Sequence, residues 1–188
     1  GYSSSVMAFW ESGKERLITQ SKEVRKYDFL FEGAGQGNTF ILKSDFFSLV
    51  QKFCLNNESI TKNFFYHDWL VYILARTNGY DWFFDERSFI KYRQHTSNET
   101  GAKGSIGGVK SRLSLILSGW YKQQVKVALE ISRLNTKKEA DLEKFEKIFN
   151  GNISFYRRLI LARFFIFNGR RKATDRMVLV FSSLLGWI

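Results

Sequence analysis

Residues 66–77 have the sequence YHDWLVYILART and determine how the surrounding chain is interpreted. Trp69, Tyr72 and Ile73 recur at helical spacing, so the stretch predicts a helix over residues 68–77 with one apolar face. Glycine follows shortly after its end, which is typical of a helix C-terminus. The helix therefore supplies an apolar face against which neighbouring elements can pack.

The chain before this helix predicts a mixture of strand and loop. Residues 2–10 are rich in serine, valine and aromatic side chains and predict a strand that ends at the turn 11–13. Residues 14–26 are polar and predict a connecting loop. Residues 33–38 form a glycine-rich loop, and residues 39–42 form a short β-like run.

A second helix and two more strands complete the first half. Ser44 is expected to cap a helix that begins at Asp45, whose apolar residues keep helical spacing: Phe46, Leu49, Val50 and Phe53. Residues 56–63 form a polar break before the central helix. After that helix, residues 80–84 and 88–92 resemble two strands with Asp85-Glu86-Arg87 between them.

The second half predicts helices throughout. Residues 96–108 contain four glycines and predict a loop or linker. Two sets of apolar residues beyond it recur on one helix face, namely Leu113, Leu117, Trp120, Val127, Ile131 and Leu134, and then Leu142, Phe145 and Phe149. The expected fold class is α/β, or α+β in isolation, with residues 1–108 as a mixed domain and 109–188 as a basic helical extension.

The net charge of +11 is concentrated in the second half. Residues 1–105 carry 13 Lys and Arg against 12 Asp and Glu, whereas residues 106–188 carry 16 against 6. A basic half with interleaved aromatic residues attracts nucleic acid, anionic lipid headgroups or phosphorylated substrates. The single cysteine, Cys54, excludes an internal disulfide.

The uncharged run at residues 177–188 has twelve residues, fewer than the roughly 20 that a transmembrane helix needs. Two interpretations of the basic helices fit equally well. They could lie on an anionic membrane surface, or they could pack on the first half with their lysines in water.

Three features could carry chemistry. Asp68, at a helix start, lies near unpaired backbone N–H groups and the positive end of the helix dipole, which suits either a helix cap or a general base. His95 could ligate a metal, hold a phosphate or simply be hydrogen-bonded in a loop. Gly33, Gly35 and Gly37 could allow close approach of a ligand or form a tight turn.

Four motifs occur in a fixed order. Gly37-Asn38-Thr39-Phe40 precedes the first helix, His67-Asp68-Trp69 opens the second, and Tyr92-Arg93-Gln94-His95 follows the strands, with Asn98 and Gly101 after it. In this order they resemble the acceptor-side half of a family 2 glycosyltransferase of the GT-A type, in particular its bacterial rhamnosyltransferase-like members. The resemblance covers about residues 1–108.

The resemblance implies an inverting sugar transfer from a nucleotide sugar to a glycan or lipid-linked acceptor. It implies that Asp68 is the base that deprotonates the acceptor hydroxyl and that His95 reaches the metal or the diphosphate. It places five residues in the substrate-binding region: Gly37, Asn38, His67, Trp69 and Arg93. A divalent metal, Mg²⁺ or Mn²⁺, is expected only together with the N-terminal half of the family.

That N-terminal half, with its nucleotide-binding units and its D-x-D metal motif, has no counterpart here, and Asp81 and Asp85 do not replace it. The chain is therefore expected to be a fragment that is inactive alone. The leading hypothesis is a bacterial enzyme of cell-surface polysaccharide biosynthesis, cytoplasmic and near the inner membrane. The alternative is a basic nucleic-acid-binding or membrane-docking module without catalytic activity.

Overall fold

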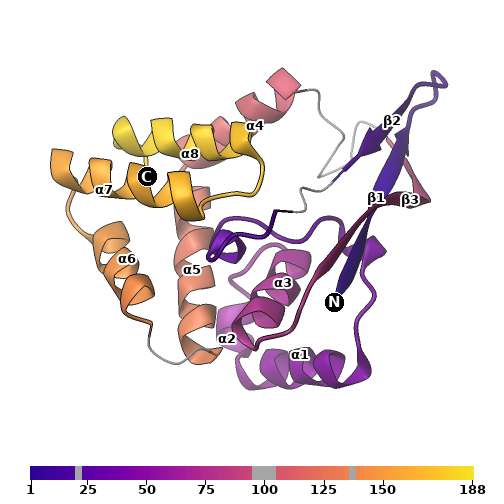
Figure 1. Cartoon of the computed structure of the whole chain (residues 1–188), viewed down its shortest axis with the longest axis horizontal. Helices are drawn as coiled ribbons and strands as arrows, with labels where there is room; N and C mark the ends of the chain where they lie inside the picture. The colour runs from indigo at the N-terminus through magenta and orange to yellow at the C-terminus, as the bar shows by residue number, and fades with distance from the viewer. Residues whose placement is uncertain (20–22, 95–104, 136–138) are drawn as a thin grey trace.

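A computed structural model describes residues 1–19, 23–94, 105–135 and 139–188. Within these ranges a small mixed sheet lies on one side of the molecule, and helices fill the rest (Figure 1). The predicted mixture of strands and helices in the first half, followed by helices in the second, is confirmed.

The sheet has three strands in the order β2-β1-β3. The central strand β1 (Tyr2–Phe9) pairs antiparallel with β2 (Glu15–Ile18) and parallel with β3 (Phe83–Arg93). The prediction of a loop over residues 14–26 is therefore wrong for β2. Side chains of β2 are mostly exposed, so the strand depends on backbone pairing and shows no alternating pattern.

The two predicted strands at 80–84 and 88–92 are one strand with a bulge. The register shifts so that Ser4 pairs with Asp85 and Ser5 with Ser88. The extra residues are held locally, because the backbone N–H and the guanidinium of Arg87 both donate to the Asp85 carboxylate. The charged sequence between the two predicted strands thus forms the bulge.

Two short 3₁₀ turns, Asp28–Leu30 and Gly37–Thr39, precede α1. The second overlaps the start of the β-like run predicted at 39–42, and of that run a bridge between Tyr2 and Ile41 remains. Helix α1 (Ser44–Asn56) starts one residue earlier than predicted. Lys43 occupies the cap position, so the capping role expected of Ser44 is wrong. A single turn, α2 (Glu58–Thr61), interrupts the predicted polar break.

The central helix α3 (His67–Thr77) confirms the helix predicted at residues 68–77. It begins after Tyr66, so Asp68 is its second residue and not its cap. Trp69, Tyr72 and Ile73 are all buried, as their spacing predicted. This packing fixes the direction in which the start of the helix presents Asp68.

Residues 105–135 and 139–188, as the structure describes them, form five helices: α4 (Ser105–Leu117), α5 (Trp120–Asn135), α6 (Ala140–Asn150), α7 (Phe155–Asn168) and α8 (Ala173–Leu184). The loop predicted over residues 96–108 is therefore wrong from Ser105 onward, and its earlier part lies outside the described residues. The apolar set predicted over residues 113–134 is split at Gly119, which has a φ of +76°. Leu117 and Leu134 are exposed, contrary to the prediction that they share a buried face. Leu142, Phe145 and Phe149 are buried in α6, as predicted.

Helices of the second half share a hydrophobic core with the first half. A buried ion network joins them as well. Asp28 is fully buried, and its carboxylate accepts from Tyr72 at 3.0 Å, from Arg76 at 2.6 Å and from Arg171 at 3.1 Å. Arg171 follows α7, so the network fixes the C-terminal helices to α3.

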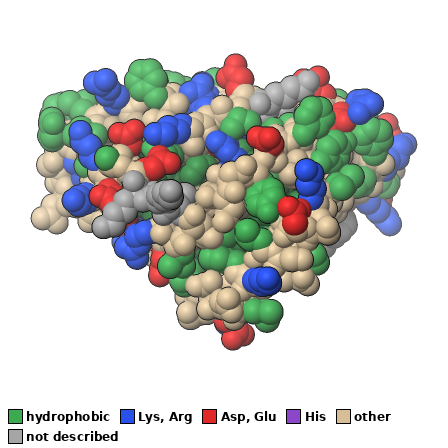
Figure 2. All heavy atoms as spheres, turned by 60° about the horizontal axis from the view of Figure 1, so that its bottom comes forward, with side chains coloured by type: hydrophobic (Ala, Val, Ile, Leu, Met, Phe, Trp, Pro, Cys, Tyr) green, Lys and Arg blue, Asp and Glu red, His purple; other side chains and the backbone are tan. Residues whose placement is uncertain are grey.

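Some of the basic residues in the second half are internal. Arg157 is buried and donates to the carbonyl oxygens of Ile148, Phe149 and Ile188. Arg171 is only 3% exposed. On the face shown in Figure 2, basic and acidic side chains are interspersed with hydrophobic ones. The net charge therefore overstates the basicity that a polyanion would meet.

Candidate active site

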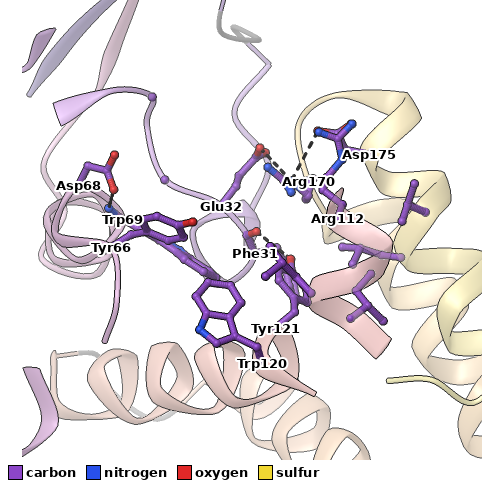
Figure 3. Close-up of a pocket in the computed structure, with 16 residues that line it drawn as sticks. Phe31, Glu32, Tyr66, Asp68, Trp69, Arg112, Trp120, Tyr121, Arg170 and Asp175 are labelled. Atoms are coloured by element: carbon purple, nitrogen blue, oxygen red, sulfur yellow. Dashed lines mark hydrogen bonds and ion pairs between the residues drawn. The ribbon is translucent and has the colours of Figure 1, made fainter. Parts of the chain in front are cut away.

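A cavity of about 310 Å³ lies between the start of α3 and helices α4, α5 and α8 (Figure 3). Its wall combines a carboxylate, an ion-paired cluster and aromatic rings. The residues that line it are Phe31, Glu32, Gly33, Gly35, Tyr66, Asp68, Trp69, Arg112, Leu115, Ile116, Trp120, Tyr121, Arg170, Asp175, Val178 and Leu179.

The glycine-rich loop and the start of α3 meet at this cavity. A Cβ atom added to Gly37 would lie 3.1 Å from His67 Nε2 and 3.3 Å from Asp68 Cβ. A Cβ atom added to Gly33 would lie 3.1 Å from the Cα atom of Trp69. Both distances are tighter than ordinary contacts, so these glycines allow the loop to approach the helix. About thirty residues of sequence separate the glycine-rich loop from the start of α3, and the fold brings these two segments together.

Asp68 lies partly buried at one end of the cavity. Its Oδ1 atom accepts from the backbone N–H of Trp69 at 2.8 Å. Burial raises the pKa of the Asp68 carboxyl, and the backbone N–H groups of Trp69 and Gly37 together with the charge of His67 oppose that rise. A carboxylate with a raised pKa accepts a proton more readily than an exposed one.

The opposite end of the cavity holds paired charges. The guanidinium of Arg170 lies 3.3 Å from Glu32 and 3.8 Å from Asp175, and Arg112 lies 2.9 Å from Asp175. The backbone N–H of Arg171 also donates to Glu32. Burial alone would lower the pKa of Arg170. The negative charges near the guanidinium have a larger combined effect, so the pKa of Arg170 is raised. This end is therefore a neutralised cluster that a polar ligand could contact.

Aromatic rings form the wall between the two ends (Figure 3). Trp69 and Tyr121 are buried, and they donate to the carbonyl oxygens of Phe29 at 2.7 Å and Phe31 at 2.8 Å. Tyr66 and Trp120 are only half-buried, and their rings meet edge to face with centroids 5.6 Å apart. The half-buried pair offers an apolar surface to a ligand, while the buried pair holds the wall in place.

The other residues singled out by the sequence lie in different places. His67 is exposed beside Asp68, and Asn38 is exposed next to Gly37. Arg93 lies at the end of β3, where it pairs with Glu11 at 2.7 Å, and it is outside the cavity wall as far as the structure describes that wall. His95, with Asn98 and Gly101, lies outside the described residues.

The described ranges contain no cluster of three or more His, Cys, Asp or Glu that could hold a metal ion. Asp85, one of the two carboxylates considered in the strand region, pairs with Arg87 at 2.7 Å, and this hydrogen bonding holds its pKa well below the usual range. The described residues therefore do not fit a resident divalent metal.

Sequence reasoning missed the paired cluster and most of the aromatic wall. Glu32 lies 138 positions before its partner Arg170, so no local spacing could connect them. The sequence does place Asp175 shortly after the pair Arg170-Arg171, a pattern that could have indicated an ion pair. These arginines were instead counted as part of the net positive charge of the second half.

The chain is similar to a dTDP-rhamnosyl transferase, RfbG, of Shigella flexneri, with 36% identity over 124 residues. The match covers 66% of this chain and 43% of the relative, so the chain spans less than half of that protein. No family model matches the chain, and no solved structure matches it. The similarity shows that the chain is related to a glycosyltransferase.

Proposed function

We propose that this chain is the acceptor-side part of a glycosyltransferase that moves a sugar from a nucleotide-sugar donor to a glycan acceptor. The observation that carries the proposal is the meeting of the Gly37 loop with Asp68, which lines one end of a cavity. The similarity to a rhamnosyl transferase supports it independently. Membership of family 2, the GT-A fold and a role in bacterial polysaccharide biosynthesis are parts of the same proposal.

In the proposed reaction Asp68 acts as the general base. Its carboxylate accepts the proton of an acceptor hydroxyl while that oxygen bonds to the anomeric carbon of the donor. The bond from the anomeric carbon to the diphosphate breaks, and the nucleoside diphosphate leaves with the electron pair. Attack from the opposite side inverts the configuration at that carbon. The raised pKa of Asp68 favours its role as the proton acceptor.

The half-buried rings would hold the acceptor. Sugar rings carry hydroxyl groups at the edge and C–H groups on the faces, so a cavity with aromatic rings and charged groups can bind both. Tyr66 and Trp120 would contact the faces, and Glu32 with Arg112 would accept and donate hydrogen bonds to hydroxyl groups. The remaining proposed contacts, through Asn38, His67 and Arg93, rest on the family resemblance.

A divalent cation in such a reaction would offset the charge that develops on the leaving diphosphate. Because the described residues do not fit one, the proposal assigns the cation to groups beyond them, and no step above depends on it. For the same reason we expect the chain alone to bind acceptors without catalysing transfer.

The burial of Arg157 and Arg171 disfavours the nucleic-acid alternative, because these side chains are occupied by internal partners. Localisation in the cytoplasm at the inner membrane is proposed with the sugar transfer. No helix within the described ranges is long and apolar enough to cross a bilayer.

The acceptor site can be tested on the chain itself by saturation-transfer NMR with rhamnose-containing oligosaccharides. We expect signals from the sugar C–H groups, and we expect Trp120→Ala to abolish them. Trp10→Ala is the matched control, because Trp10 directly follows β1 and does not line the cavity. Equal loss of signal in both variants, or retention in both, would contradict an acceptor site at the cavity.

A further inference from the structure

Helix α7 presents an apolar face to solvent. Phe155 is 75% exposed and Phe167 is 62% exposed. At 100° per residue, the exposed positions fall on one side of the helix: Phe155, Tyr156, Leu159, Arg163, Ile166 and Phe167. The opposite side, with Arg157, Leu161 and Phe165, is buried. Such a face is the reverse of what a surface helix in water usually shows.

Helix α8 also exposes apolar side chains. It packs against α7 at the end of the molecule away from the sheet (Figure 1). Met177, Phe181 and Leu185 follow one another at intervals of four residues and are all exposed, and Trp187 is exposed beyond the helix end. Together these side chains and those of α7 form what we call the C-terminal apolar surface.

Cations outnumber acidic side chains at this surface, although the neighbouring α6 contributes both signs. Asp141 and Lys144 line a hollow with Phe167, and Glu143 and Lys147 line another with Tyr156. Residues 151–188 contain seven Lys and Arg and a single acidic residue, Asp175, but Arg157 and Arg171 are buried and Arg170 is paired with Glu32. Asp175 is buried and paired with Arg112, so it does not contribute to the surface. Arg163 and Lys172 are exposed, the former within the apolar face itself.

We propose that the C-terminal apolar surface docks on an anionic lipid bilayer. Exposed phenylalanine and leucine side chains would enter the interface, Tyr156 and Trp187 suit the headgroup level, and the cations would meet lipid phosphates. A second copy of the chain fits less well, because each copy would bring Arg163 into an interface whose α7 face carries no acidic side chain. A nucleic acid fits less well because it would leave the apolar rings in water.

The docking geometry has a consequence for the cavity. Asp175, Val178 and Leu179 of α8 line the cavity, while Met177 and Phe181 face outward from the same helix. A helix is about 10 Å wide, so docking would place the cavity close to the headgroups. A sugar carried on a lipid would be presented at that level. This consequence rests on the proposed sugar transfer, whereas the docking itself does not.

Docking can be tested by flotation of the chain with vesicles. We expect it to float with phosphatidylcholine vesicles that contain about one third phosphatidylglycerol, to float weakly with phosphatidylcholine alone, and to be partly released by about 0.5 M NaCl. The double variant Phe155→Ala/Phe167→Ala should lower the vesicle partition coefficient roughly tenfold or more. The variant Arg163→Gln/Lys172→Gln should lower binding to the anionic vesicles selectively.

The matched control is Phe83→Ala/Phe89→Ala on β3, since each of these rings is 63% exposed. It should float like the unmodified chain, and circular dichroism should show that both double variants fold. Equal losses in the two double variants would overturn the proposal. So would a chain that ignores vesicles but forms a dimer that Phe155→Ala/Phe167→Ala dissociates. The assay contains no sugar, so its failure would leave the proposed transfer standing.

Discussion

At one end of the cavity Asp68 is held by backbone N–H groups, whereas at the other end Glu32 and Asp175 are paired with arginine side chains. This difference determines which carboxylate can act as a general base. A carboxylate beside a guanidinium is stabilised in its charged form and accepts a proton poorly. Asp68 has a pKa that burial raises, and it therefore can take a proton from a bound hydroxyl. The paired end fixes the shape of the cavity instead.

The largest expected effect comes from Asp68→Asn in the complete enzyme. General-base catalysis contributes on the order of 10²–10⁴ in rate, so kcat should fall by about that factor. The measurement is acceptor-dependent release of the nucleoside diphosphate. The Asp68→Asn variant should still fold.

The raised pKa means that the folded protein binds the proton of Asp68 more tightly than the unfolded chain does. The resulting contribution to stability is present below pH 3.8 and is lost as the pH rises through the raised pKa.

Asp45→Asn is the matched control, because Asp45 is the second residue of α1 as Asp68 is of α3. Both substitutions remove a charge near a helix N-terminus, and both should change the free energy of unfolding by less than about 1 kcal/mol. Only Asp68→Asn should change the rate. Unchanged turnover in Asp68→Asn would refute its role as the base.

Substitutions in the ion-paired network should change the free energy of unfolding. Arg171→Met removes a cation from the buried carboxylates of Asp28 and Glu32 and should lower the free energy of unfolding by about 3–5 kcal/mol. Urea denaturation of the chain measures this. Lys172→Met, one position along and exposed, should change it by less than about 0.5 kcal/mol. Similar values for the two variants would mean that the network contributes little.

Sequence patterns predicted the parts of this molecule that depend on local spacing. Helices α3 and α6 were predicted correctly because each buries one face, and the apolar residues of that face recur at intervals of three and four positions. Strand β2 was missed because its exposed side chains carry no such pattern. The motifs around Gly37 and Asp68 indicated one end of the cavity. The pairs between Glu32, Arg112, Arg170 and Asp175 join distant positions, which only the fold could bring together.

A smaller effect is expected from Gly37→Ala, which tests how closely the loop must approach Asp68. The added Cβ would meet His67 Nε2 at 3.1 Å and Asp68 Cβ at 3.3 Å, so one of them must move. Overpacking of this kind costs about 1–3 kcal/mol, less where a flexible side chain can yield. We expect kcat to fall roughly tenfold through displacement of Asp68. In the background His67→Ala, part of the loss should be recovered, which kinetic comparison of the single and double variants would measure.

The smallest expected effect concerns the pH dependence at the Asp68 end. The base must be ionised, so kcat/KM should fall on the acidic side with an apparent pKa above the ordinary value of 3.8 for an aspartate. The charge of His67 lowers the pKa of Asp68, so His67→Gln should move this acidic limb further upward. Arg112→Gln, at the paired end, should leave the position of the acidic limb unchanged. A limb that moves equally in both variants would show that the two ends of the cavity are electrostatically coupled, and the contrast between them would fail.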